Sequence, residues 1–248
     1  MLPVRRERPY YTKDWTFMNP AKKTTSIEEW KKVYPEKFAT EDEIFSNIRR
    51  GQHIFVTSGC GEPQYLISAM TKYVESHPKA FFDAEIIQIY SLGLAPYTDE
   101  KFKSNFRHNS FFIGDNTRNS VNTGLADYTP IFLSNVPGLM RSGRIHIDVA
   151  LIHAHRADRY GNANGLLGKP EELCGPLGLF SADAEYADYI CLLAGTVSDS
   201  LIVPASISME LVDFVVPVPS AGQNSGIGSG TLDIAKAKAN PFNAKIAA

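Results

Sequence analysis

The sequence predicts an α/β protein built on an open, mostly parallel β-sheet with helices on both faces. Short apolar runs rich in β-branched and aromatic residues recur along most of the chain, and segments long enough to form a helix separate them. Several runs are followed directly by Gly, Ser, Asn or Pro. The alternation of strand, turn, helix and strand is typical of a parallel sheet with helical crossovers.

Each apolar run is short enough to be one buried strand, and each intervening segment carries helix-forming residues. The expected strands are residues 53–58, 85–92, 110–114, 129–134, 147–154 and 188–195, and the expected helices are residues 62–77, 116–125, 135–143 and 181–187.

The chain divides into three parts by composition. Residues 1–45 form a polar and aromatic N-terminal extension with one short helix, capped by Thr25 or Ser26 and ending near Pro35. Residues 46–220 form the main α/β domain. Residues 221–248 begin as a Gly/Ser/Asn loop and stop within a helix start, so a linker or interface segment is expected there.

The bulk properties exclude several classes of protein. A net charge of −2 does not indicate a nucleic-acid partner. No apolar run is long enough to span a membrane, and no secretory signal follows the basic start. The cysteines, which lack a metal-ligand spacing, are expected to be reduced thiols in a cytoplasmic protein: they are Cys60, Cys174 and Cys191.

The first candidate site is the loop at residues 56–66, because ligands bind beyond the carboxyl ends of strands in open parallel sheets. Gly59 and Gly61 allow a sharp turn and a close approach of backbone to a ligand. The following helix start offers N–H groups to an anion. A plain strand-to-helix turn explains the glycines equally well, and Glu62 suits the helix dipole better than the role of a nucleophile.

The second candidate is the polar segment at residues 113–130. Arg118 carries a planar fork of donors suited to a carboxylate or phosphate. Asp115 or Asn116 is a natural N-cap. The segment is either a ligand-binding wall or a capped surface helix in which Arg118 pairs with Asp115 or Asp127.

The third candidate is the polar stretch His153–Gly165, which follows an apolar run. His153 and His155 share one face of an extended chain, but no third metal ligand lies at a telling spacing. Asp158, Gly161 and Asn162 fit a tight turn at the carboxyl edge of the sheet. The histidines are therefore expected to line a cleft, with no bound metal.

Four segments in order resemble the class I coenzyme A transferases, in particular the N-terminal half of the acetyl-CoA hydrolase/transferase group. The segment at residues 148–165 resembles the "A-D-x-x-G-N" element of their α half. Residues 114–140 resemble the N-terminal half of the acetate and hydroxybutyrate CoA-transferases, and residues 57–70 are similar to the Gly-rich loop after the first strand of that half. Residues 226–247 are similar to the region joining the halves in related enzymes and citrate lyase α chains.

The resemblance implies the CoA-transferase (NagB/RpiA-like) architecture and transfer of CoA between an acyl-CoA and a small carboxylic acid. In this family a glutamate of the second half is the nucleophile, so no catalytic residue is assigned here. A β-type subunit, a homo-oligomer or a missing half is expected to supply that glutamate. Coenzyme A is a substrate and no other cofactor is implied. The expected binding residues are Ser58, Gly59, Gly61, Glu62, Gln64, Asn116, Arg118, Asn119, His153 and His155.

Two other functions stay open: an acyl-CoA hydrolase, in which water replaces the acceptor acid, and a non-catalytic module that binds CoA or an acid. A sugar-phosphate isomerase of similar architecture is disfavoured, because it would need clustered lysines and acidic residues at the strand ends.

Overall fold

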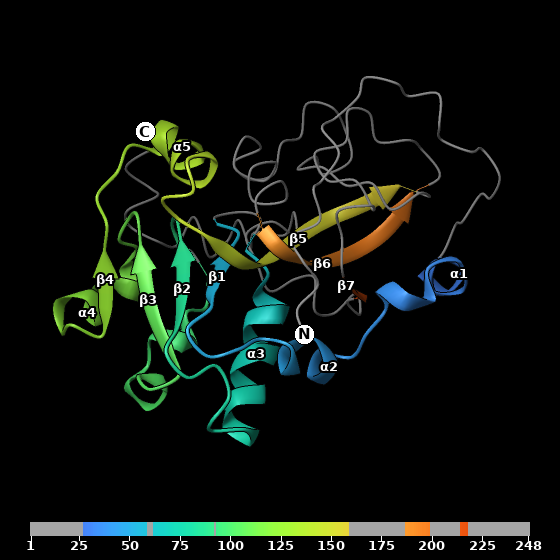
Figure 1. The fold of residues 1–248 in the computed structure, drawn as a ribbon, viewed down its shortest axis with the longest axis horizontal. Coiled ribbons are helices and arrows are strands. Elements are labelled where there is room, and N and C mark those ends of the chain that lie inside the picture. Colours follow the sequence, from blue (N-terminus) through green and yellow to red (C-terminus); the bar gives the residue numbers. More distant parts are fainter. Residues whose placement is uncertain (1–26, 59–61, 92, 159–186, 199–213, 218–248) are drawn as a thin grey trace, which may run out of the picture.

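The computed structural model describes residues 27–58, 62–91, 93–158, 187–198 and 214–217. Its strands form one sheet in the order β4-β3-β2-β1-β5-β6-β7, and every neighbouring pair is parallel (Figure 1). The predicted fold class is therefore confirmed. The strands are β1 His53–Val56, β2 Ala84–Gln88, β3 Phe106–Ser110, β4 Ala126–Tyr128, β5 Ile147–Asp158, β6 Ala187–Ser198 and β7 Phe214–Pro217.

The strand order creates a switch point in the middle of the sheet. Strands β2, β3 and β4 are added outward on one side of β1, whereas β5, β6 and β7 extend from its other side. The strand that follows β1 in the sequence therefore lies on one side of it, and the strand that follows β5 lies on the other. In open α/β sheets this is the place where ligands bind, beyond the carboxyl ends of the strands.

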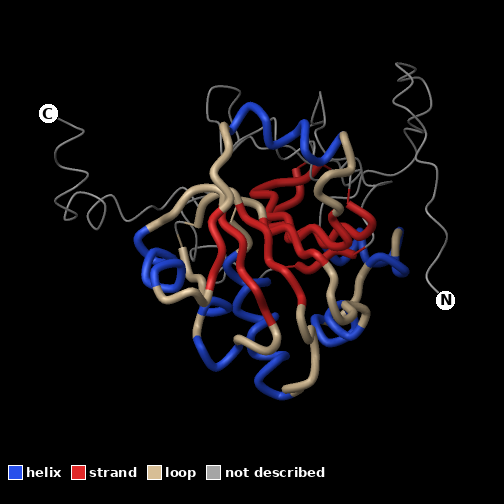
Figure 2. The backbone as a smooth tube through the Cα atoms, turned by 60° about the vertical axis from the view of Figure 1, so that its left-hand side comes forward, coloured by secondary structure: helices blue, strands red, loops and turns tan. Residues whose placement is uncertain are grey.

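Helices lie between β1 and β2, between β3 and β4 and between β4 and β5 in the sequence. In Figure 2 helices lie both above and below the strands. The helices expected at 62–77, 116–125 and 135–143 are confirmed as α3, α4 and α5, and the N-terminal helix as α1. Among the described helices, none has the length and apolar character needed to cross a membrane. The helices are α1 Ile27–Val33, α2 Glu41–Ser46, α3 Gln64–Ser76, α4 Asp115–Asn122 and α5 Val136–Arg141, and the 3₁₀ turns are η2 Pro35–Lys37, η4 Pro96–Thr98, η5 Glu100–Phe102 and η6 Leu133–Asn135.

Helix α2 lies in the part of the chain expected to be an extension. It begins with a capping box, in which the Thr40 side chain accepts from the backbone N–H of Glu43 and the Glu43 carboxylate accepts from the backbone N–H of Thr40. The bonds that the Glu43 carboxylate accepts from the backbone N–H and from the hydroxyl of Thr40 lower the pKa of Glu43. Ile44 and Phe45 anchor the helix by packing into the core.

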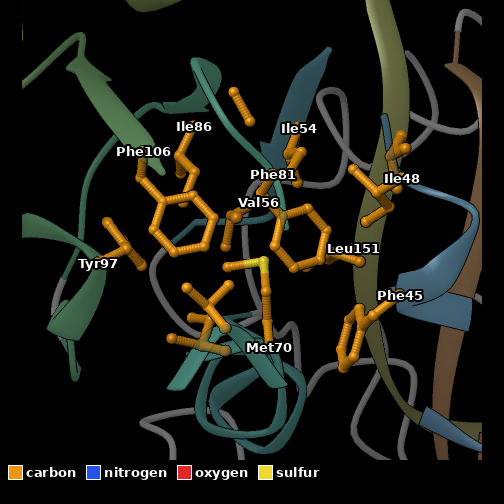
Figure 3. Packing of buried hydrophobic residues seen from close by; sticks show 14 of the residues in the cluster. Phe45, Ile48, Ile54, Val56, Met70, Phe81, Ile86, Tyr97, Phe106 and Leu151 are labelled. Carbon is orange, nitrogen blue, oxygen red and sulfur yellow. The ribbon is translucent and has the colours of Figure 1, made fainter. Parts of the chain in front are cut away.

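The main core lies between the sheet and helices α2 and α3 (Figure 3). Met70 of α3 and Phe45 of α2 pack with Ile86 and Phe106, which belong to the facing strands. Each is at most 3% exposed, and burial of a side chain of this size contributes about 1.5–3 kcal/mol. This packing fixes the sheet and thereby the positions of the loops at its carboxyl edge.

Two strand predictions were wrong. The expected strand at 110–114 follows the real strand β3, whose sequence FRHNS alternates buried and outward-facing residues instead of forming an apolar run. The run at 129–134 is not a strand, because β4 ends at Tyr128 and Phe132 is 79% exposed. Strand β7 was not predicted. The cap residues Thr25 and Ser26 and the expected helix at 181–187, except Ala187 in β6, lie outside the described residues.

Candidate functional site at the carboxyl edge of the sheet

The loop after β1 is tied to both neighbouring strands. Ser58, an expected binding residue, is 5% exposed, and its Oγ accepts hydrogen bonds from the N–H groups of Ile89 (2.9 Å) and Tyr90 (3.2 Å) beyond β2. On the other side, the N–H of Thr57 donates to the carbonyl of Leu151 in β5 (3.1 Å). The chain therefore leaves the sheet at the switch point in one fixed direction.

Glu62, which lies in the same loop after β1, is the centre of a buried polar network. It is only 2% exposed. Its Oε2 accepts from Nε2 of Gln64 (2.8 Å) and from the backbone N–H of Gly93 (2.7 Å). Its Oε1 accepts from Nε2 of Gln88 (2.7 Å). Three donors thus converge on one carboxylate, which satisfies it in a place that water does not reach.

Two further donors orient the amides that bind Glu62. The N–H of Leu94 donates to Oε1 of Gln64 (2.7 Å), and the hydroxyl of Tyr97 donates to Oε1 of Gln88 (2.6 Å). Burial, followed by the negative charge of Glu62, raises the pKa of Tyr97, so its hydroxyl stays protonated and remains a donor. We call Glu62, Gln64, Gln88, Gly93 and Tyr97 the Glu62 network.

The loop after β3 joins this network through Asn116, the second residue of α4. Its Nδ2 donates to Oγ of Ser91 (2.8 Å) and to the carbonyl of Gly93 (2.7 Å). The approach is close, because a Cβ at Gly114 would lie 2.6 Å from the carbonyl oxygen of Ser91. Asn116, Gln64 and Glu62, all expected site residues, are therefore brought together at one edge of the sheet.

Arg118 and Asn119 lie on the exposed surface of α4. The Arg118 side chain is 57% exposed, and its Nη2 lies 3.5 Å from Oδ1 of Asp115. The other partner considered, Asp127, binds the guanidinium of Arg107 through both carboxylate oxygens, and this pairing lowers the pKa of Asp127. Among the residues that the structure describes, Arg118 is thus held only by a long, exposed contact.

The prediction of a turn after His153 was wrong for the residues up to Asp158. Strand β5 continues to Asp158, which pairs with Ser198 of β6, so His153, His155 and Asp158 all lie within the strand. The long pairing with β6 overrides the polar residues that suggested a turn. His153 is 9% exposed. The side chain of His155 and the residues Gly59, Gly61 and Asn162 lie outside the described residues.

Sequence reasoning missed Gln88, Tyr97 and Gly93. Gln88 ends strand β2 directly after Ile86 and Ile87 and is fully buried. A glutamine in such a run is a usable signal, because a buried amide requires polar partners. Gly93 carried no signal of its own. A Cβ there would lie 2.1 Å from Nε2 of Gln64, a contact that only the folded structure reveals.

Large apolar side chains are exposed on the carboxyl side of the sheet, in segments that follow or end β2, β3 and β4. Phe132 is 79% and Leu94 60% exposed. We call the set the carboxyl-edge apolar residues: Leu94, Phe112, Tyr128, Phe132 and Leu133. Within the described part of the chain, no group of three His, Cys, Asp or Glu residues is arranged to hold a metal ion.

Two family models match the sequence. The N-terminal domain of acetyl-CoA hydrolase/transferase matches residues 18–168, and the citrate lyase alpha subunit matches residues 113–248. The chain is 37% identical over 133 residues to the 4-hydroxybutyrate coenzyme A transferase of Clostridium kluyveri, covering 54% of this chain and 30% of the relative. It is 41% identical over 92 residues to the citrate lyase alpha chain of Haemophilus influenzae, covering 37% of this chain and 18% of that protein.

Solved structures share the fold at low identity. RipA from Yersinia pestis has a TM-score of 0.61 at 18% identity, covering 76% of this chain and 43% of that one. The alpha subunit of citrate lyase from Streptococcus mutans, in complex with citrate, has a TM-score of 0.55 at 20% identity, covering 82% and 39%. The aligned regions thus span less than half of each relative. The citrate lyase alpha-subunit model covers more than half of the sequence, and so does the acetyl-CoA hydrolase/transferase model. On the latter match the chain belongs to the acetyl-CoA hydrolase/transferase group of the class I coenzyme A transferases, in its N-terminal half.

Proposed function

We propose that this chain is the α-type half of an enzyme that moves CoA between an acyl-CoA and a small carboxylic acid. The observation that carries the proposal is the match to the acetyl-CoA hydrolase/transferase N-terminal domain over residues 18–168. That range includes the three loops that Glu62 and Asn116 join at the switch point. The relatives named as CoA transferases support the same class of reaction.

The nucleophile belongs to a second half or a partner chain. Its glutamate attacks the thioester carbonyl and releases the CoA thiolate, which leaves a mixed anhydride. The thiolate then returns to form a glutamyl-CoA thioester and frees the first acid. The acceptor carboxylate attacks this thioester, which expels the CoA thiolate and leaves a second mixed anhydride. The thiolate attacks the acyl carbonyl of that anhydride, which forms the new acyl-CoA and regenerates the free glutamate. Glu62 does not suit this role, because three N–H donors stabilise its buried carboxylate and lower its reactivity.

This chain contributes binding and orientation. Arg118 is a fixed cation on α4, and its solvent-facing guanidinium is available to the anionic groups of CoA or the acid. The carboxyl-edge apolar residues are the surface on which the second half docks. Exposed apolar side chains grouped in this way mark contact surfaces, and the relatives extend well beyond the aligned region.

The test is to purify the tagged chain together with the polypeptides that bind it, and to assay the assembly with acetyl-CoA and a small carboxylate acceptor. Acceptor-dependent formation of a new acyl-CoA is expected, and mass spectrometry should find a glutamate-bearing second half. Turnover by this chain alone would contradict a nucleophile supplied in trans.

An acyl-CoA hydrolase is the second candidate, because the matching family includes hydrolases by its description. Release of CoA at the same rate with and without an acceptor acid would favour it. Binding of acetyl-CoA with no turnover by the assembly would favour a non-catalytic module instead.

A further inference from the structure

The peptide groups on either side of Gly93 connect three loops of the carboxyl edge. The N–H of Gly93 donates to Glu62 in the loop after β1, and its carbonyl accepts from Asn116 at the start of α4. Gly93 itself belongs to the loop after β2. One short stretch of backbone is therefore held from both sides, and Glu62 is its acceptor on the side nearest the switch point.

We infer that Glu62 is a positioning residue, which holds Gly93 and Leu94 and, through Gly93, the loop that carries Asn116 in the geometry that binds acyl-CoA. It acts through the backbone and does not contact the substrate. The inference rests on the proposed function, because the ligand whose binding it serves is the one assigned there. It also makes a prediction for the free chain that requires no ligand.

The network requires that both terminal atoms of the side chain at position 62 be acceptors, one for the amide of Gln64 and one for the amide of Gln88. Tyr97 donates to Oε1 of Gln88, so the Nε2 of Gln88 faces Glu62. The N–H of Leu94 donates to Oε1 of Gln64, so the Nε2 of that amide faces Glu62 as well. If either amide were flipped, its Nε2 would face a donor, and the hydrogen bond from Tyr97 or from the N–H of Leu94 would be lost. A carboxylate has acceptors on both oxygens, whereas a glutamine amide would direct one N–H group against another donor.

The arrangement leaves no spare room around Gly93. A Cβ there would lie within 2.8 Å of three atoms of the Gln64 side chain amide. The Gln64 amide thus packs directly against the Gly93 backbone while it binds the carboxylate of Glu62. Loss of the acceptor at position 62 would free both the amide and the loop, and the effect would appear first at the N–H groups of Gly93 and Leu94.

The decisive variants are Glu62→Gln and Glu62→Ala. Val74→Ala is the control, chosen because it also lowers the stability of the fold. Val74 lies near the far end of α3 with 2% of its surface exposed, so its truncation destabilises the core without touching the network. Amide hydrogen exchange is measured in the full chain, and kcat and the KM for acetyl-CoA are measured in the assembly with the second half.

Exchange at Gly93 and Leu94 is expected to rise about tenfold or more in both Glu62 variants relative to Val74→Ala. The KM for acetyl-CoA is expected to rise by at least about fivefold in the same two variants, with kcat within about twofold of the wild type. Val74→Ala should lower the melting temperature while leaving KM unchanged.

Equal exchange at Gly93 and Leu94 in the Glu62 variants and in Val74→Ala would overturn the positioning role. An unchanged KM in a variant whose loop exchanges faster would overturn the link to acyl-CoA binding. A large loss of kcat with KM unchanged would also overturn it, because that result indicates a role in chemistry. Absence of acyl-CoA turnover in the wild-type assembly would instead refute the proposed function, and the exchange comparison would still decide whether Glu62 positions the loop.

Discussion

The Nε2 atom of Gln88 lies 2.7 Å from Oε1 of Glu62, and this bond joins the last residue of β2 to the loop after β1. Gln88 is fully buried, and its other amide atom accepts from the hydroxyl of Tyr97. A single side chain thus connects a carboxylate at the switch point with a tyrosine in the following loop. The contribution of Gln88 to the free energy of unfolding can be measured without any substrate.

Gln88→Leu should destabilise the chain by about 1–3 kcal/mol for each polar group that it leaves unpaired in the interior. The substitution removes a donor from Glu62 and the acceptor of Tyr97. Combining it with Tyr97→Phe should cost less than the sum of the two single changes, because the unpaired hydroxyl is then absent. Urea unfolding of the four proteins measures this coupling, and strict additivity would show that the two side chains are energetically independent.

Gly93→Ala should destabilise the chain although the substitution adds only one methyl group. The new Cβ would lie 2.1 Å from Nε2 of Gln64, so the Gln64 side chain must move and release Glu62 and the N–H of Leu94. The expected loss is about 1–3 kcal/mol in the free energy of unfolding.

Gly138→Ala is the matched control for this change. A Cβ at Gly138 meets no atom within 4 Å, and the residue lies within helix α5. Alanine there should stabilise the chain by about 0.5–1 kcal/mol, because glycine is costly inside a helix. Equal effects of the two glycine substitutions on urea unfolding would contradict the tight packing of Gln64 against Gly93.

These predictions concern a network that the sequence revealed only in part. The carboxyl edge of the sheet as the place to look, two members of the network (Glu62 and Gln64) and Asn116, which joins it, followed from the rule that residues after parallel strands share one edge. The position of Gly93 depends on contacts between loops distant in sequence, and sequence periodicity carries no record of them. Strand β3 was missed for a related reason, since His108 and Ser110 are polar residues buried by the tertiary structure.

His108 should make the stability of the chain depend on pH in the weakly acidic range. It is 1% exposed, neither ring nitrogen has a hydrogen-bond partner in the described part of the chain, and burial lowers its pKa to about 4. The unfolded chain, with a histidine pKa near 6.5, binds a proton that the folded chain excludes. Stability should therefore fall by about 3 kcal/mol as the pH decreases from about 6.5 to about 4.

The substitution His108→Leu tests this origin of the pH dependence. It removes the titrating ring and leaves an apolar side chain beside Tyr97, which the imidazole contacts edge-on with ring centroids 5.1 Å apart. Urea unfolding at several pH values should give a flatter stability profile between pH 6.5 and 4, with the largest gain at the acidic end. A profile parallel to that of the wild type would assign the pH dependence to other groups.

Arg118→Lys should weaken the binding of acetyl-CoA or of the acceptor acid and leave the fold intact. Lysine keeps the positive charge but loses the planar fork that binds a carboxylate or phosphate through two hydrogen bonds. The expected loss of binding is about 1–3 kcal/mol, because a hydrogen bond to a charged group contributes about 1.5–3 kcal/mol. Stability should change little, because the exposed Arg118 contact with Asp115 is 3.5 Å long and such surface pairs contribute about 0–1 kcal/mol.

Arg50→Lys is the control for the loss of an arginine fork at the surface. Arg50 pairs with Asp83 at 2.7 Å with 71% of its side chain exposed, and it lies before β1, at the opposite end of that strand from the proposed binding edge. Calorimetric titration of the assembly with acetyl-CoA should show weaker binding for Arg118→Lys and unchanged binding for Arg50→Lys. A lower melting temperature for Arg118→Lys with full affinity would show instead that Arg118 braces the start of α4 through Asp115, since Asp127 is already bound by Arg107.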